Sequence, residues 1–269
     1  AIAPGENILH TGDDIAADQP ELHRRVALAD FAEHGVGRDT AILEHDLVGR
    51  SAAEDDFVQL ADRIAPLAEQ SSSWKPYQAL ASGYFEKLRG NPTAAMAAFD
   101  RCLELSAPSN AGHFGFAWPL ATAGLSEALI ELGHHAQAAR LARAGLMRCR
   151  KSGVLWLSHL VVRALALAEA KLGEAPRAIA RIERLMASEE EVAILGLHRA
   201  VTYEVRARLA LEVRDLAGAR LYALFALQAR GGGAASISAR FEEILMRVAT
   251  LNVAAGGASG AVKARRLHL

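Results

Sequence analysis

Apolar residues recur three and four positions apart over most of the chain, which is the spacing of one face of an α-helix. From residue 76 onward these stretches alternate with short breaks rich in glycine or polar residues. Alternating apolar and polar runs, which would predict strands, are nearly missing, and the frequent residues Ala, Leu, Arg and Glu favour helix. The pattern predicts consecutive helices separated at 90–92, 107–115, 133–134, 152–153, 173–176, 214–215 and 231–233.

The same pattern divides the chain into four segments. Residues 1–19 are polar and irregular, and residues 20–70 carry helices that include a capping box at Ser51–Glu54. The regular helices occupy residues 76–252, the last of them beginning near Ile237, and residues 254–269 form a basic tail that we expect to be flexible. Ala53 and Phe57 lie at repeat-like positions, 42 residues before Ala95 and Phe99, so residues 20–70 are a candidate degenerate repeat.

Small residues recur at fixed separations within the regular helices. In three consecutive units a small residue and an alanine lie twelve apart, at 126 and 138, 166 and 178, and 207 and 219. In the first unit the two positions, Ala81 and Ala95, lie fourteen residues apart. Small residues are needed where paired helices approach closely, and large residues fill the space toward the next pair. The spacing therefore predicts four stacked helix pairs.

The residues around these positions resemble the tetratricopeptide repeat. The first unit reads Tyr77-x-x-Leu80-Ala81-x-x-Tyr84, followed by Ala95-x-x-x-Phe99-x-x-Cys102. The units are 40 to 43 residues long, against about 34 in the standard repeat. They resemble the long-repeat solenoids in the C-terminal sensor regions of large bacterial ATPase or kinase regulators, the maltose-type transcription activators among them. The resemblance implies an all-α, right-handed superhelical solenoid of antiparallel helix pairs, whose first helices line a concave face.

Three features depart from the repeat pattern. Arg206 stands where Leu is expected, and Glu169 stands where an aromatic residue is expected. The proline that closes a repeat occurs only as Pro108. These departures leave the subfamily open.

Charge and cysteine content restrict the partners and the compartment. The net charge is −1, from 30 basic and 31 acidic residues, which disfavours nucleic-acid binding. Cys102 and Cys149 fall in apolar helical patterns, so we expect buried, reduced thiols and a cytoplasmic location. No long uncharged apolar run predicts a membrane span. The given sequence begins at Ala1 without an initiator Met or a signal peptide, which suggests either a fragment of a longer protein or a processed N-terminus.

Catalytic and metal-binding motifs are missing from the sequence. It has no phosphate-binding glycine loop, no His-Glu-x-x-His and no Cys/His cluster, so we expect no enzyme activity, no cofactor and no metal. His134 and His135 follow Gly133 and are interpreted as turn residues, with metal ligation as the alternative. The acidic run Glu189–Glu191 is interpreted as the start of a helix, where it would complement the helix dipole.

Candidate binding residues lie on the first helix of each pair. Counting from the small residue of each unit predicts a groove of mixed charge, in which Arg163 and Arg208 could clamp a carboxylate or phosphate. The alternative is ion pairing within a solvated face. Two tryptophans near helix starts would either add to the groove or pack over helix ends. The candidate groove residues are Trp118, Glu127, Glu131, Trp156, Arg163, Lys171, Glu204 and Arg208.

Three functional hypotheses follow from these observations. The first is a non-catalytic module that binds a protein, a peptide or a small effector, as the sensor or scaffold part of a larger bacterial signalling or transcription-regulatory protein. The second is a structural module that forms homo-oligomers through its apolar end helix, Ile237–Val253, or through its N-terminal helix, and a concentration-dependent mass would favour it. The third is an all-helical enzyme with a site not visible as a motif, which a closed pocket with paired carboxylates would favour.

Overall fold

A computed structural model describes residues 62, 64–106, 117–154, 157–191, 196–230 and 242–251 of the 269-residue chain. The chain divides into two compact units, Ala1–Ile42 and Leu43–Leu269, and every described residue belongs to the second unit. The irregular segment 1–19, the tail 254–269 and Trp156 lie outside the described residues. The boundaries expected for these segments therefore stay predictions.

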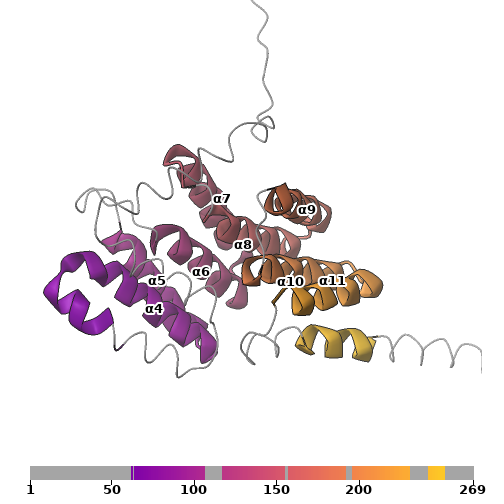
Figure 1. Ribbon diagram of the computed structural model, residues 1–269, viewed down its shortest axis with the longest axis horizontal. Coiled ribbons are helices and arrows are strands. Elements are labelled where there is room, and N and C mark those ends of the chain that lie inside the picture. Colours follow the sequence, from indigo (N-terminus) through magenta and orange to yellow (C-terminus); the bar gives the residue numbers. More distant parts are fainter. Residues whose placement is uncertain are drawn as a thin grey trace, which may run out of the picture. The chain divides into compact units, whose positions relative to one another are not determined.

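The described residues form helices, and short turns join the two helices of each pair, as the hydrophobic pattern predicts (Figure 1). Residues 64–70 and 242–251 are also helical. The elements are η1 (Ser72–Trp74, a 3₁₀ helix), α4 (Lys75–Leu88), α5 (Pro92–Leu105), α6 (Ala117–Glu131), α7 (His135–Lys151), α8 (Ser158–Lys171), α9 (Ala175–Glu191), α10 (Leu197–Glu212) and α11 (Leu216–Arg230). The all-α class is confirmed.

Four turns of the same design connect the two helices of each pair. Each has a central residue in the left-handed region, which is Gly90, Gly133 or Gly173 in the first three turns and Arg214 in the fourth. The residue after it donates its N–H to a carbonyl five residues earlier, as from His134 to Leu129 at 2.8 Å. This is the hydrogen bond of a Schellman helix end, and it reverses the chain within three residues. Each pair is therefore an antiparallel hairpin of helices.

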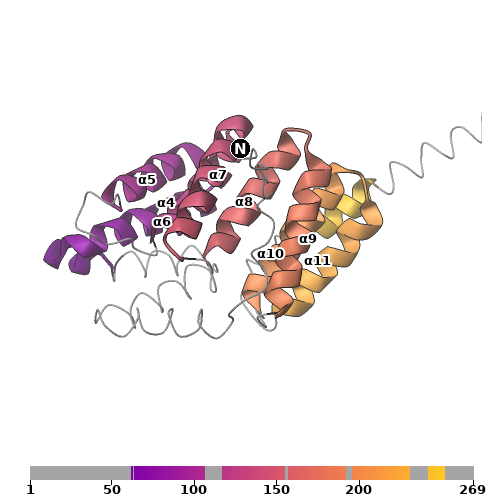
Figure 2. The same cartoon turned by 90° about the horizontal axis from the view of Figure 1, so that it is seen from above.

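The helices stack in two layers (Figure 2). The first helices α4, α6, α8 and α10 each pack against the next first helix in the series. The second helices α5, α7 and α9 each pack between their own first helix and that of the following pair. The helix at 242–251 closes the series, because its Ile244 and Val248 join a core cluster with residues of α10 and α11.

The predicted small residues lie where the helices approach each other. All eight are buried: Ala81, Ser126, Ala166 and Ala207 on first helices, and Ala95, Ala138, Ala178 and Ala219 on second helices. Glycines allow a still closer approach in the first two pairs. A Cβ atom built on Gly83 or Gly124 would lie 2.5 Å from the ring of Phe99. Phe99 of α5 is thus held between the backbones of α4 and α6.

The structure corrects the sequence interpretation at the end of α9. The acidic run Glu189–Glu191 is the last turn of α9 and not the start of a helix. A separate helix, α10, begins at Leu197 after Gly196, whose φ of 67° marks a break that the apolar pattern did not predict. Carboxylates at a helix C-terminus face the unfavourable end of its dipole. The dipole explanation for this run is therefore wrong, and its position needs another cause.

Candidate binding surface

Four of the predicted groove residues remain accessible on the layer of first helices. Glu127 forms an ion pair with Lys87 of α4. Lys171 pairs with Glu212 of α10 at 2.5 Å, and Glu131 is exposed. Arg208 is partly accessible and pairs with Glu204 one turn earlier at 2.6 Å. Two of these pairs connect successive first helices, so the accessible charges also hold the layer together. We call Lys87, Glu127, Glu131, Lys171, Arg208 and Glu212 the charged ladder.

Arg163 and Glu204 differ from that set because they are buried. The side chain of Arg163 is 2% exposed and that of Glu204 is 1% exposed. They occupy equivalent positions of α8 and α10, each three residues before the small residue of its helix. They do not line an open groove wall, which corrects the expectation of a solvated face. Truncating Arg163 to Ala is therefore expected to destabilise the fold rather than leave it intact.

Glu189 explains why an acidic run ends α9. It is fully buried, and its Oε1 accepts a 2.7 Å hydrogen bond from the Thr202 hydroxyl of α10. The same oxygen lies 3.5 Å from Nδ1 of His159 and 3.9 Å from Nη2 of Arg163. The other oxygen, Oε2, lies 3.8 Å from Nη1 of Arg199. These partners, not the helix dipole, account for the carboxylate at the helix end.

Burial determines the electrostatics around Arg163. It lowers the pKa of the Arg163 guanidinium, and the carboxylates of Glu189 and Glu204 act in the opposite direction. Burial also raises the pKa of the Tyr84 phenol far above its ordinary value, with a smaller contribution from Cys102. The Tyr84 hydroxyl donates to the carbonyl of Leu120 at 3.3 Å. The Tyr84 side chain therefore links α4 to α6.

The two predicted tryptophans have different outcomes. Trp118 begins α6 and is 7% exposed, with the guanidinium of Arg148 4.3 Å from its ring centroid. This placement favours packing over groove formation for Trp118, because a ligand could reach little of its ring. Trp156 lies outside the described residues.

The two departures from the repeat pattern are buried charges that join neighbouring helices. Glu169 takes the expected aromatic position of α8 and accepts two 2.9 Å hydrogen bonds from Arg181 of α9. Arg143 of α7 reaches the same carboxylate at 3.3 Å, and Arg177 of α9 reaches it at 3.4 Å. Burial alone would raise the pKa of Glu169, but the three arginines together lower it below the ordinary value. Glu169 therefore connects α7, α8 and α9.

Arg206 acts in the same way one pair further along. Its Nη2 donates to Glu183 of α9 at 3.1 Å, and its guanidinium carbon lies 4.7 Å from the ring centroid of Tyr222 on α11. Tyr222 in turn stacks on Tyr203 with a centroid separation of 6.3 Å. The repeat pattern identified Glu169 and Arg206 as unusual, but it could not predict their partners, since these lie on other helices.

The structure also places the cysteines and the turn histidine His134 that the sequence singled out. Cys102 and Cys149 are free and buried, as predicted. His134 lies in the turn before α7 and makes no side-chain cap there. The described part of the chain contains no group of three or more metal-ligating residues. None of the described helices is long and apolar enough to cross a membrane.

A shallow hollow lies on the side of the second helices. It has a volume of about 240 Å³ between α5, α6 and α7. Its lining is mostly apolar, with Asp100 on one wall and Arg140 on the other. Burial, followed by the charge of Glu104, raises the pKa of Asp100. The hollow was not predicted from the sequence, because it results from the separation of α5 and α7 over α6.

Comparisons with known proteins give a structural likeness. No family model matches the chain, and no curated protein matches it. Among solved structures, BtubC (BKLC) from P. vanneervenii is similar to it, with 14% sequence identity over 80% of this chain and 92% of that chain, and a TM-score of 0.48. The chain is an all-α stack of antiparallel helix pairs.

Proposed function

We propose that this chain is a non-catalytic binding module that docks a protein or peptide on the charged ladder of its first helices. The observation that carries the proposal is the accessibility of these charges on a continuous layer of helices. Stacked pairs present an extended surface that no single helix could offer. As the sequence resemblance implies, we infer that the module is the sensor or scaffold part of a larger bacterial signalling or regulatory protein.

The mixed charge of the ladder indicates the character of the partner. Lys171 and Arg208 are accessible cations of α8 and α10, while Glu127 and Glu131 are accessible anions of α6. A partner segment that complements these four residues has acidic residues toward Lys171 and Arg208 and basic residues toward Glu127 and Glu131. Such complementarity contributes to orientation and association rate more than to affinity.

The test is affinity capture with a charge-swapped ladder. The double variant Lys171→Glu/Glu212→Lys reverses one rung and keeps both the intramolecular pair and the net charge. The matched control is Arg101→Glu/Glu104→Lys, which swaps an exposed pair of α5. We expect a saturable protein partner that binds at least about tenfold more weakly to the ladder variant, the loss of about one charge-assisted contact. Equal binding to both variants would remove the ladder from the proposal.

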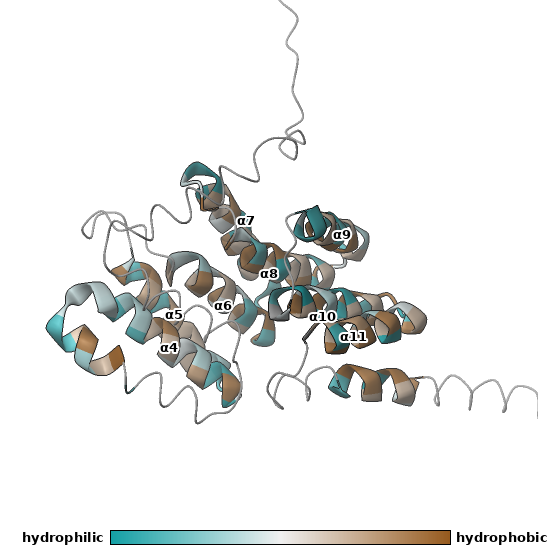
Figure 3. Ribbon diagram, in the orientation of Figure 1, coloured by the Kyte–Doolittle hydropathy of each residue, from teal (hydrophilic) through white to brown (hydrophobic). Residues whose placement is uncertain are grey.

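Exposed apolar residues favour self-association as a second candidate. Leu221, Leu224 and Phe225 lie three and four residues apart on α11 and are all exposed. Met246 on the neighbouring 242–251 helix is 63% exposed. Figure 3 shows hydrophobic residues along both helices. Sedimentation velocity over a concentration series tests this candidate, and a mass that stays monomeric at high concentration rejects it. If the mass rises, Leu224→Glu is expected to return it to that of the monomer.

A further inference from the structure

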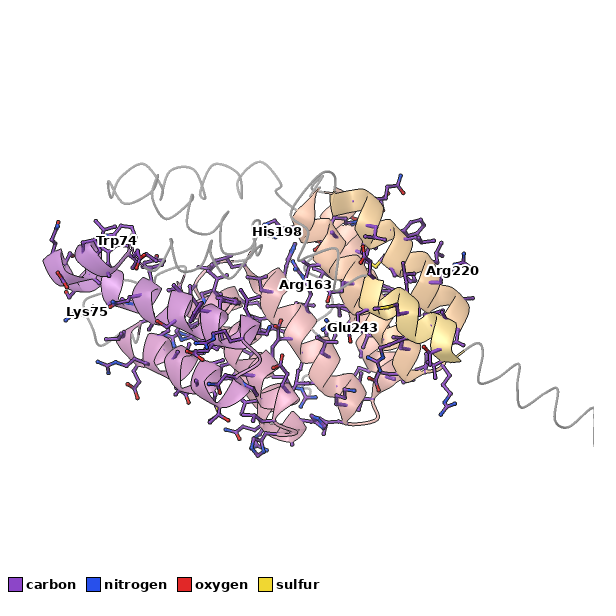
Figure 4. The ribbon with its side chains drawn as sticks, turned by 90° about the horizontal axis from the view of Figure 1, so that it is seen from below. Trp74, Lys75, Arg163, His198, Arg220 and Glu243 are labelled. Atoms are coloured by element: carbon purple, nitrogen blue, oxygen red, sulfur yellow. The ribbon has the colours of Figure 1, made fainter. Side chains whose placement is uncertain are left out.

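The apolar core of the stack is divided into clusters, two of which meet at α8. One core cluster runs from Tyr77 of α4 to Ala168 of α8, and a second joins Ala166 of α8 to Ile182 of α9 and Leu209 of α10. Beside them lie four polar side chains that are each less than a tenth exposed. We call Arg163, Glu189, Thr202 and Glu204 the polar cluster. Figure 4 labels Arg163 on α8 and His198, one turn before Thr202 on α10.

Hydrogen-bonding capacity in the polar cluster exceeds what the described residues use. Nε, Nη1 and Nη2 of Arg163 are buried, and no described residue accepts a hydrogen bond from them. The ion pair with Glu189 spans 3.9 Å, too long for a hydrogen bond. Oε2 of Glu189 likewise has no hydrogen-bond donor among the described residues. A buried polar group without a hydrogen-bond partner lowers stability by more than one hydrogen bond raises it. Each such group in a native protein therefore requires an explanation.

The charges of the polar cluster restrict what could satisfy these groups. Glu204 is neutralised by Arg208 at 2.6 Å, and Arg199 pairs with Glu190 at 3.6 Å. Arg163 and Glu189 are the buried cation and anion whose polar atoms lack hydrogen bonds among the described residues, and Nη1 of Arg199 also lies 3.8 Å from Oε2 of Glu189. A simple anion placed at Arg163 would also face the Glu189 carboxylate, and a simple cation at Glu189 would face the guanidinium. A ligand with both charges meets both groups without net repulsion.

We propose that the polar cluster binds a small zwitterion of the α-amino acid class. The ligand's carboxylate accepts hydrogen bonds from the guanidinium of Arg163, whose planar fork suits that geometry. Its ammonium group donates to Oε2 of Glu189, while Thr202 continues to hold Oε1. The side chain of His159 lies 3.5 Å from Glu189 and is 16% exposed. This names a small effector for the proposed module, and it does not rely on the charged ladder.

The experiment measures the thermal midpoint of the purified chain with each of the twenty amino acids over a concentration series. We expect one or a few of them to raise the midpoint in a saturable way, by about 5–10 °C at one hundred times the dissociation constant. Propionate and ethylamine, which each carry one of the two charges of alanine, are expected to give no shift. Isothermal titration of the best amino acid should confirm one site per chain.

Two variants assign the response to the polar cluster. Arg163→Met removes the guanidinium, and Glu189→Gln keeps the shape and the acceptor for Thr202 while removing the charge. Both are expected to abolish the shift, and Arg101→Gln on the surface of α5 is expected to retain it. Circular dichroism verifies folding. If Arg163→Met does not fold, the Glu189→Gln result and the wild-type titration decide.

Several results would overturn the inference. These are the lack of binding by any amino acid to the wild-type chain, an equal shift with propionate, or a shift retained in folded Glu189→Gln. The charged-ladder variant Lys171→Glu/Glu212→Lys separates the two proposals. It should lose the protein partner but keep the amino acid, so failure of one proposal leaves the other measurable.

Discussion

Buried charges occupy positions where the repeat pattern calls for apolar side chains. Glu169 and Arg206 each reach two neighbouring helices, so each replaces a packing contact with directed hydrogen bonds. Removing one partner of such a group leaves the others buried and unsatisfied, which costs more than the pair itself contributes. Single-residue changes here are therefore expected to have larger effects than changes at exposed pairs.

The lowered pKa of Glu169 predicts a dependence of stability on pH. A carboxylate whose pKa is lower folded than unfolded adds stability above the unfolded pKa of about 4.3, and that stability is lost as the pH falls through the folded pKa. We expect Glu169→Gln to lower the free energy of unfolding by about 1–3 kcal/mol at pH 7. The loss is limited because Arg143 and Arg177 are partly exposed, so water can solvate their charges once the carboxylate is gone. Urea titrations at pH 7 and pH 3 measure this difference.

The effect of Glu169→Gln should shrink at pH 3, because the wild-type carboxyl is then losing its charge as well. The control is Glu104→Gln, which removes an exposed pair with Arg101 and should change stability by less than about 0.5 kcal/mol. If the free energies of unfolding of the wild type and of Glu169→Gln differ by the same amount at both pH values, the ion pairs of Glu169 contribute no pH dependence.

The two cysteines predict slow thiol chemistry in the folded chain. Burial raises the pKa of the Cys102 thiol to about 12 and that of Cys149 to about 11. At pH 8 the reactive thiolate is then at least about 100-fold scarcer than for an ordinary thiol. Reaction with a disulfide reagent should be slow in buffer and complete within seconds in guanidinium. The variants Cys102→Ser and Cys149→Ser separate the two, and rapid labelling of either thiol in buffer would contradict its burial.

At the scale of the element, the four connecting turns differ in the residue that holds the left-handed position. Arg214 has φ of 59°, where three glycines serve in the equivalent turns. A non-glycine residue in this region is strained by about 1 kcal/mol or more. Replacing it with glycine relieves that strain but also raises the conformational entropy of the unfolded chain, which offsets part of the gain in stability. We expect Arg214→Gly to raise the free energy of unfolding by about 0.5–1 kcal/mol and Gly173→Ala to lower it by a similar amount or more. Chemical denaturation tests both, and a destabilising Arg214→Gly would show that the arginine side chain outweighs the strain.

Close helix approach makes a second prediction at this scale. Alanine at Gly124 would favour the helix by about 1 kcal/mol but would place Cβ 2.5 Å from the Phe99 ring. Since the two backbones hold that ring on both sides, we expect a net loss of about 1–2 kcal/mol. In a Phe99→Leu background the same change should become neutral or stabilising. Additive effects in this double-mutant cycle would contradict the contact.

The sequence predicted the elements more fully than the site. Periodic apolar residues and turn glycines are local signals, and they placed α4 to α8 and the twelve-residue spacing of the small residues. The break before α10 was missed because apolar residues continue on both sides of Gly196. The surroundings of Arg163 could not be predicted, since its partner Glu189 lies on α9 and is held there by Thr202 of α10. A charged residue at a first-helix position has the same local signature whether it is solvated or buried.

At the scale of the whole stack, burial is distributed unevenly among the helices. In α6 all residues but Glu127, Ile130 and Glu131 are buried, because α4, α5, α7 and α8 all pack against it. The helix at 242–251 is anchored by Ile244 and Val248 while most of its other residues are exposed. In stacks of repeats stability is approximately a sum over units and neighbouring interfaces. Local opening should therefore be rare at α6 and frequent at 242–251.

Hydrogen exchange followed by mass spectrometry tests this distribution. We expect the slowest exchange in α6 and α8 and the fastest, among the described helices, in 242–251. The Gly124→Ala variant supplies the sharper comparison, because its clash with Phe99 lies between α4, α5 and α6. If units couple only to their neighbours, exchange in that variant speeds up in α4 to α6 and changes little in α10 and α11. Equal acceleration in every helix would mean that the stack unfolds as one cooperative unit, with the buried charges of Glu169 and Glu189 joining one pair to the next.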